Sequence, residues 1–457
     1  MIKVLERPSI TLQRMVIDYL EFNEDSLADE YALDIGRYPY IQIGNLVIQT
    51  DYTTKIVLHN DQFLPKIEIF FEEPTMKLID GLFPLDDEIV SLFIQSSSES
   101  LMPVRMDFKI TEFNVARLDS RINYVLVGLL NVDFLYYQDA YLYSDTSFNV
   151  LRKIAKKSNL GFATNIDDTD DFMSWINAND SNMEFIQDVV KYSYRSDDSF
   201  MLSYIDFYYN LNYVDIETEL DEDISETKAI FFGSNFFKDK KDITTNLILT
   251  NHPNVINSNM YIAKYNIVNN STAVNLDIGY RKYITYFDKT GNIRYEHIID
   301  SLSTSEENNA ILKGRTGELS QIFKNSINYK YLGTIDTDNV HPNYLYAKVQ
   351  NEQNLDFFQK VRMKITLKSM NFNLYRFQKV KIELYKLEEL NMDEVPNIEE
   401  NTEGKRSIDW DKNRLNQRLS GEWLITAINY TFNKHGGFLQ EVTLARRELG
   451  FNEEDFK

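Results

Sequence analysis

Alternating apolar and polar residues predict strands in the first and in the last quarter of the chain. In each segment every second residue is apolar, which is the pattern of a strand with one buried and one wet face. The apolar positions are Val104, Met106, Phe108 and Ile110 in the first segment and Val361, Met363, Ile365 and Leu367 in the second. We expect these eight side chains to face the interior of two β-barrels.

A helical period replaces this alternation between residues 140 and 216. The sequence "SDTSFNVLRKIAKKSNLGF" predicts a helix that is capped near Thr146 or Ser147 and ends at Gly161. A second helix follows Ser181, which forms a capping box with Glu184. Behind it, residues 204–213 read as one long strand, and an acidic run up to Glu226 reads as an exposed connector. Together these segments predict a compact α+β insert.

Two β-rich segments therefore flank one α+β segment. We expect a first tube-like barrel over 1–135, the insert over 136–227, a β-rich peripheral domain over 228–355, and a second barrel over 356–457. The second barrel would carry a long loop near 388–420 and close with a hairpin around "NKHGG". The tripeptide VRM occurs at both Val104 and Val361, which suggests a duplication. The predicted fold class is mainly β, with two tube-like barrels and peripheral α+β and β-rich domains.

Composition narrows the classes of function. The net charge is 48 − 70 = −22, so the overall field does not favour adhesion to nucleic acid phosphates. Cysteine is absent, which excludes disulfides and thiolate chemistry. The N-terminal residues lack a secretory pattern, and the densest apolar run, from Tyr124, is too short to span a bilayer. We expect a soluble protein made in a cytosol, with no stable membrane association.

The sequence contains no recognisable catalytic, cofactor or metal motif. The five histidines are scattered without ligand spacing, and no Walker or HExxH sequence occurs. The acidic run "NIDDTDDF" lacks the glycine and glutamate of a calcium loop and reads as a solvated loop. With 70 acidic residues, the sequence neither supports nor removes a carboxylate pair of the glycosidase kind. The aromatic run Tyr204 to Tyr213 fits a core and interface strand better than a carbohydrate platform.

One basic stretch stands out in this acidic chain. Between Lys360 and Lys386 there are eight Lys or Arg residues and one acidic residue. Arg362, Lys364 and Lys368 lie on the wet face of the predicted strand. This face is either an ordinary solvated surface or an interface with an acidic partner or neighbouring subunit.

The order of these elements resembles the central baseplate hub of contractile-tailed bacteriophages, which is related to the late control D and VgrG proteins. Three stretches carry the resemblance: "PKIEIFFEEP…FPLDDEIVSLFI…PVRMDFKITEF", "SWINANDSNMEFIQDVVKYSYRSDDSF…YIDFYYNLNYV" and "SGEWLITAINYTF…GGFLQEVTLARREL". Residues 228–355 and the 388–420 loop lie outside it.

The resemblance implies a homotrimer in the virion baseplate, assembled in the host cytoplasm. Six barrels would form a ring that adapts the sixfold tail tube to a threefold spike and leaves a channel for the genome. The implied partners are the tail tube protein, the trimeric spike, baseplate wedge proteins, the tape measure and DNA in transit without specific binding. This role needs no enzyme activity, no cofactor and no metal. The alternatives are a tail-associated cell-wall hydrolase, the spike hub of a secretion system and a carbohydrate-binding module.

Overall fold

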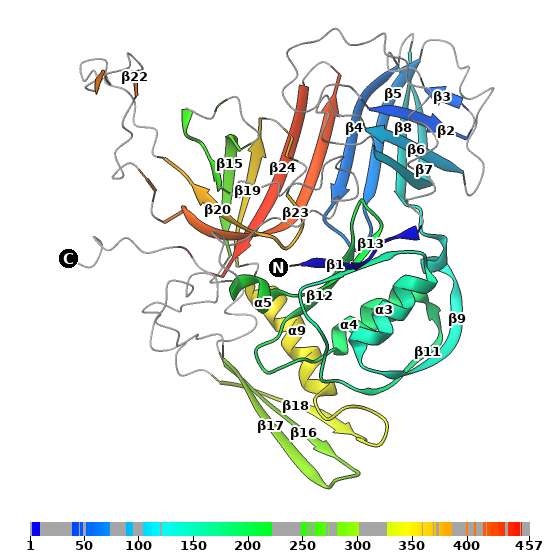
Figure 1. The fold of residues 1–457 in the computed structure, drawn as a ribbon, viewed down its shortest axis with the longest axis vertical. Coiled ribbons are helices and arrows are strands. Elements are labelled where there is room, and N and C mark those ends of the chain that lie inside the picture. The colour runs from blue at the N-terminus through cyan, green and yellow to red at the C-terminus, as the bar shows by residue number, and fades with distance from the viewer. Residues whose placement is uncertain are drawn as a thin grey trace.

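The fold is mainly β with an α+β insert, as the hydrophobic pattern predicts. The computed structural model describes residues 2–9, 39–73, 88–94, 104–118, 121–221, 248–270, 281–300, 327–385 and 418–447, with some positions omitted inside these ranges. It also describes short pieces at 399–400, 406–407 and 415–416. Figure 1 shows two β-rich blocks side by side, with the insert and a smaller three-stranded sheet beneath them. Among the described helices, none has the length and apolar character needed to cross a lipid bilayer.

The first block precedes the insert in the chain. Its strands are β2 (Tyr40–Ile43), β3 (Leu46–Ile48), β4 (Thr53–Asn60), β5 (Lys66–Glu73), β6 (Ile89–Ile94), β7 (Val104–Leu118) and β8 (Arg121–Leu130). In β7, Met106 and Phe108 are buried as predicted and Ile110 is half-buried, while the side chain of Val104 lies outside what the structure describes. Asp107 alternates with these apolar residues, so the pattern places it on the wet face, yet it is also buried. Its carboxylate accepts hydrogen bonds from Ser91 and Arg105, and these bonds offset the cost of removing the charge from water.

The second block contains the C-terminal strands. They are β14 (Ile248–Thr250), β15 (Ile262–Asn269), β19 (Val361–Leu367), β20 (Lys379–Glu383), β23 (Gly421–Asn433) and β24 (Gly437–Arg446). In β19, Val361, Met363, Ile365 and Leu367 are fully buried, which confirms the predicted faces of that strand. The β23–β24 hairpin is also confirmed, and Gly437 adopts the positive φ of 79° that its turn requires. A short pair, β21 (Glu399–Glu400) and β22 (Arg406–Ser407), lies in the predicted 388–420 loop, most of which is outside the described residues.

Both blocks belong to one hydrogen-bonded sheet. Its strand order is β15-β19-β24-β23-β4-β5-β8-β7-β6-β2-β3, with β20 and β14 attached beside β23. The strands β14 and β15 come from the region expected to be a peripheral domain, yet they pair with β20 and β19. Among the described strands, no ladder closes either block into a barrel. In the second block, however, a single parallel bridge joins Thr250 at the end of β14 to Tyr261, the residue before β15.

The α+β insert contains two small sheets, three α-helices and one short 3-10 helix. Its elements are η2 (Asp133–Tyr136), β9 (Gln138–Asp145), α3 (Ser147–Lys157), β10 (Gly161–Thr164), β11 (Met173–Ser181), α4 (Asn182–Tyr192), β12 (Met201–Ile205), β13 (Asn210–Asp215) and α5 (Ile216–Asp221). The N-terminal strand β1 (Lys3–Glu6) joins its larger sheet beside β10. Thr146 caps α3 and Ser181 forms the capping box with Glu184 in α4, so both predicted helix starts are confirmed.

The predicted end of α3 is wrong. The helix ends at Lys157, and Asn159 takes the left-handed conformation at φ 59°. Gly161 instead begins β10, where an added Cβ would lie 2.1 Å from the Asn210 side-chain oxygen. The glycine is therefore needed for the close approach of two strands and not for the helix stop.

The acidic run after Asp215 is not an exposed connector at its start. Residues 216–221 form α5, in which Ile216, Glu219 and Leu220 are buried. Asp215 is buried too, and its carboxylate accepts hydrogen bonds from the Phe200 amide and from Arg195. The rest of the run, from residue 222, lies outside the described residues.

The third unit follows β15 in the chain. It consists of β16 (Arg281–Asp288), β17 (Ile293–Asp300), β18 (Ile327–Ile335) and α9 (Tyr344–Phe358). The turn "KTGN" at residues 289–292 joins β16 to β17, and there the Gly291 amide donates to Asp288 at 2.9 Å. The helix α9 packs against α4, and the Asn351 side chain donates to the carbonyls of Val190, Lys191 and Ser193 at the end of that helix.

Candidate functional site

The two β-rich blocks repeat one strand order. The first block follows the path β4-β5-β8-β7-β6-β2, and the second follows β15-β19-β24-β23-β20-β14. Taken in chain order, the strands match one to one: β2 with β14, β4 with β15, β5 with β19, β6 with β20, β7 with β23, and β8 with β24. Each pair of neighbouring strands has the same relative direction in both blocks, with one exception. β2 is antiparallel to β6, whereas β14 is parallel to β20. The sheet therefore contains a duplicated unit.

A β-bulge lies at the same place in both hairpins. It leaves Thr111 unpaired between Ile110 and Glu112 of β7, and Thr426 unpaired in the same way in β23. The Thr111 hydroxyl donates to the Val127 carbonyl at 3.3 Å, and the Thr426 hydroxyl donates to the Thr443 carbonyl at 3.2 Å. Val127 and Thr443 are matched by the register of the two hairpins. A threonine hydroxyl thus stabilises the bulge at the matched position of each block.

A second matched irregularity fixes the alignment of the outer strands. β4 and β15 are each eight residues long. The register of β4 against β5 shifts between Thr53 and Lys55, and that of β15 against β19 shifts between Ile262 and Lys264. Both shifts fall at the second residue of the strand. Lys264 therefore corresponds to Lys55, and Asn269 corresponds to Asn60.

The VRM echo does not mark this repeat. Val104 begins β7, whose counterpart is β23, whereas Val361 begins β19, whose counterpart is β5. The proposed equivalence of these two tripeptides is wrong, although a duplication exists. The sequence signal at matched positions is "ITEFN" from Ile110 and "ITAIN" from Ile425, which share the bulge threonine and an asparagine.

The blocks meet along one antiparallel strand pair, which we call the seam. Residues 428–433 of β23 pair with residues 60–55 of β4. On one face of the seam, Tyr430 lies opposite Leu58 and Phe432 lies opposite Ile56, and all four side chains are buried. The first half of β23 pairs instead with β20. A single long strand therefore completes its own block and also binds the neighbouring block.

Arg376 holds the seam from the segment before β20. Its Nε donates to the Thr426 carbonyl at 2.7 Å, and its two Nη atoms donate to the carbonyls of Gln62 and Asp61 at 2.6 and 3.1 Å. Its guanidinium also lies 5.0 Å from the centre of the Tyr204 ring in the insert. Burial lowers the pKa of Arg376 to about 10, which leaves the group charged at neutral pH. One cation thus links the bulge of the second block, the β4–β5 turn of the first and the insert.

The insert reaches this junction through the turn between β12 and β13. Asp206 lies in the turn, where its carboxylate accepts hydrogen bonds from the Tyr208 and Asn210 amides and from the Asn210 and Asn212 side chains. Tyr209 adopts a positive φ of 60°. Burial raises the pKa of Asp206 despite these bonds, because desolvation disfavours the charged form. The single long strand predicted over 204–213 is therefore wrong, since these polar contacts fold it into a hairpin.

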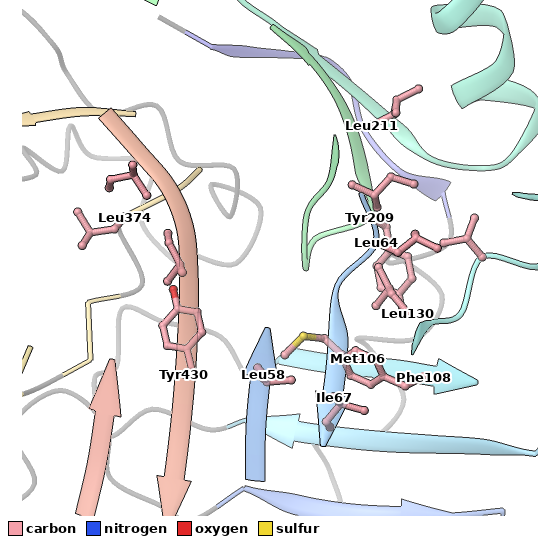
Figure 2. Packing of buried hydrophobic residues seen from close by; sticks show 14 of the residues in the cluster. Leu58, Leu64, Ile67, Met106, Phe108, Leu130, Tyr209, Leu211, Leu374 and Tyr430 are labelled. Atoms are coloured by element: carbon pink, nitrogen blue, oxygen red, sulfur yellow. The ribbon is translucent and has the colours of Figure 1, made fainter. Parts of the chain in front are cut away.

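The turn binds the first block directly. The Tyr209 hydroxyl accepts from the Asp107 amide at 3.0 Å and lies 3.3 Å from the Asp107 carbonyl, to which it donates. The Ile205 amide donates to the Phe63 carbonyl at 2.8 Å. Figure 2 shows Tyr209 next to Leu64 and Leu130, with Met106 and Leu58 between them and Tyr430 of the second block. One continuous hydrophobic core therefore crosses all three parts. Tyr209 and Tyr213 are fully buried in this core, and Tyr204 is fully buried in a second cluster beside Phe377. Because their rings are covered, these three tyrosines cannot form a carbohydrate platform.

The acidic run "NIDDTDDF" is also more structural than the sequence predicts. Asp171 is fully buried, and its carboxylate accepts from the amides of Ser147 and Tyr194 and from the Thr169 hydroxyl. Ser147 begins α3, so this carboxyl group lies at the positive end of a helix, while burial raises its pKa. The run is therefore not simply a solvated loop. Within the described residues, no three His, Asp or Glu side chains gather in a way that would hold a metal ion.

The third unit docks on the insert through aromatic rings. His341 is buried near Trp175 and Tyr194, and its Nε2 donates to the Tyr192 carbonyl at 3.0 Å. Tyr344 of α9 stacks on Tyr192 of the insert with ring centres 4.0 Å apart. Tyr346 meets the Tyr194 ring edge-on and is itself stacked, within the third unit, on His297 at 4.2 Å. Burial lowers the pKa of both histidines.

The predicted interface residues lie on the wet face of β19. Arg362, Lys364 and Lys368 are exposed, and Lys364 forms an ion pair of 2.8 Å with Glu441 of β24. Their role as an interface stays a prediction. Sequence reasoning missed Arg376, Asp206 and Thr426, because no local pattern distinguishes them from other surface or turn residues.

Comparison with known proteins finds similarity in structure alone. No protein-family model matches the sequence, and no curated protein matches it significantly. A 43 kDa tail protein of prophage MuSo2 from Shewanella oneidensis is 12% identical with a TM-score of 0.47, covering 90% of this chain and 96% of its own. A tail protein from Neisseria meningitidis is 8% identical with a TM-score of 0.48, covering 89% and 96%. The VgrG complex with PdpA from Francisella is 8% identical with a TM-score of 0.45, covering 90% and 58%.

Proposed function

We propose that the chain is a structural hub of a phage tail baseplate and acts as a homotrimer rather than as an enzyme. In this proposal three chains place six repeated blocks around a channel. The ring adapts a sixfold tail tube to a threefold spike, and the genome passes through the channel without specific binding. The domain boundaries that the sequence predicts are part of this proposal.

The observation that carries the proposal is the duplicated block joined across the seam. A chain that carries two copies of one unit, paired strand to strand, offers three copies of itself as six similar wall segments. The seam buries aromatic and aliphatic side chains on one face, as a permanent contact does. The sequence resemblance to baseplate hubs points to the same role.

Charge supports passage of the genome rather than its capture. The whole chain carries a net charge of −22, so non-specific adhesion to phosphates is disfavoured. The wet face of the second block nevertheless carries Lys264, Arg362 and Lys364, with Glu441 beside them. This face is therefore suited to contacts with acidic neighbours, and the tube, spike, wedge and tape-measure proteins are the proposed partners.

Mass photometry and negative-stain imaging of the purified chain test the proposal. We expect a trimer and a threefold ring with a central hole, either for the chain alone or after addition of the tube or spike protein. A folded chain that stays monomeric with both proteins present would contradict the hub role.

A cell-wall hydrolase is the main alternative, and no feature of the described residues favours it. Incubation with isolated peptidoglycan should leave turbidity unchanged. A rapid loss of turbidity would show that the chain hydrolyses peptidoglycan and would contradict a purely structural role. A hub in a secretion machine would use the same ring, and purification of assembled particles from the source would separate it from a virion.

A further inference from the structure

We propose that residues 111–118 of β7 pair with β15 of a second copy of this chain, in the register that the seam already shows inside one chain. The proposal rests on the hub role above, because it specifies how neighbouring copies join.

The repeat leaves one half of β7 without its expected neighbour. In β23 the first half pairs with β20 and the second half pairs with β4 on the same side. In β7 the first half pairs with β6, which is the counterpart of β20. Within the described residues, no strand occupies the position beside residues 111–118 that corresponds to β4. The counterpart of β4 is β15. On its side away from β19, β14 meets the described chain only through a bridge from Thr250 to Tyr261, just before β15 begins. Residues 264–269 of β15 have no strand partner on that side in the described part of the chain.

These two edges do not pair with each other within one chain. Six strands lie between β7 and β15 in the sheet, and the two strands lie on opposite sides of it (Figure 1). A second copy supplies the missing strand without any rearrangement. Because a different edge is used on each partner, the contact is head-to-tail, and successive contacts can close a ring.

The two matched bulges predict the register of the new pair. In the seam, Asn429 lies opposite His59 and Tyr430 lies opposite Leu58. Matched positions place Asn114 opposite Val268 and Val115 opposite Ile267 in the second copy. The next pair on the same face as Val115 is Arg117 opposite Tyr265.

The exposed side chains of the two edges fit this pairing. Val115 is 38% exposed and Tyr265 is 46% exposed, whereas their seam counterparts Tyr430 and Ile56 are 4% and 0% exposed. Pairing would cover Val115 with Ile267 and would place the Arg117 guanidinium beside the Tyr265 ring, a favourable cation–π contact. Unpaired strand edges with exposed apolar side chains tend to bind another strand.

Cysteine cross-linking tests the register directly, because the natural chain has no cysteine. The variant Asn114→Cys/Val268→Cys replaces two exposed residues that the proposal places opposite each other in different chains. The matched control, His59→Cys/Asn429→Cys, places cysteines at the corresponding pair inside one chain. A third variant, Asn114→Cys/Asn266→Cys, shifts one thiol by two residues to a diagonal position about 7–8 Å away, beyond the reach of a disulfide.

After mild oxidation, the first variant should form covalent dimers and closed trimers on a non-reducing gel. The seam control should lose its thiols without any gain in mass, and the shifted variant should give little product. Neither single variant, Asn114→Cys or Val268→Cys, should cross-link, since a head-to-tail contact never brings like positions together.

Light scattering on the same samples separates the two proposals. A trimer that does not cross-link would overturn the strand pairing and leave the ring intact. A trimer that cross-links through a single variant would show a two-fold contact and would also overturn the pairing. A chain that stays monomeric and uncross-linked, with tube and spike proteins present, would overturn both.

Discussion

The second halves of β7 and β23 occupy matched places in a duplicated unit, yet one is exposed and the other is buried. Phe432 is fully buried against β4, while its counterpart Arg117 is exposed. Both strands share the bulge, the threonine hydroxyl bond and the hairpin register. The comparison shows that the internal frame of each block is set by its own strands. Whether the side chains at the outer edge of a block are apolar or polar depends on which strand pairs with that edge.

The largest effect should come from a charge placed at the two matched positions. Phe432→Asp leaves a buried carboxylate without a partner in the seam and should cost about 3–5 kcal/mol of unfolding free energy. Arg117→Asp changes an exposed side chain, so the isolated chain should lose no more than about 0.5 kcal/mol. Urea unfolding of the monomeric form measures both. Equal losses would mean that the two edges do not differ in the way described.

Loss of the Arg376 guanidinium should come next. Arg376→Met leaves the carbonyls of Asp61, Gln62 and Thr426 without this donor and should cost about 3 kcal/mol, since hydrogen bonds to charged groups contribute about 1.5–3 kcal/mol. Arg152→Met is the matched control, because Arg152 is about half exposed and pairs with Glu6 on the surface. Its loss should be below about 1 kcal/mol. Thermal unfolding followed by circular dichroism compares the two variants. Similar melting temperatures would show that Arg376 does not stabilise the seam.

The bulge threonines should show a smaller difference. Thr426→Val removes the half-buried hydroxyl that donates to Thr443 and should cost about 1 kcal/mol. Thr111→Val should cost less than about 0.5 kcal/mol, because water can replace the same bond at an exposed position. Assembly into a trimer should increase the cost of Thr111→Val if β7 gains a partner. An unchanged cost in the assembled protein would argue against that partner.

The smallest effect should be a pH dependence outside both blocks. Burial lowers the pKa of His297 and His341 below the ordinary value of 6.5, so the folded protein binds these protons more weakly than the unfolded chain does. The docking of the third unit is therefore fully stable above that value and weakens as the pH falls below it. Hydrogen exchange should become faster in α9 on acidification, after correction for intrinsic rates, and not in β4 or β23. His297→Phe keeps an aromatic ring in the stack and should reduce this response.

The sequence predicts local faces and helix starts well, and long-range relations poorly. Alternation identifies the buried side of β19, and the Ser181–Glu184 pair identifies the start of α4, because both depend on neighbours in the sequence. The hairpin at Asp206 was missed, because a carboxylate surrounded by asparagine amides is a tertiary arrangement within an otherwise strand-like run. The VRM echo misled, because alternating strands resemble each other wherever they occur. The informative echo, the bulge threonine with an asparagine three residues later, acquires meaning only through the register.

The corner between β4 and β5 is a tight turn over residues 61–65, while the matched corner between β15 and β19 accommodates everything from residue 270 to residue 360. The strands on either side keep the same register in both blocks. The block therefore tolerates a long insertion between these two strands. This corner is therefore a natural graft point. A foreign module placed there, or the third unit exchanged for a short loop, would change the periphery of the protein while leaving its strand frame unchanged.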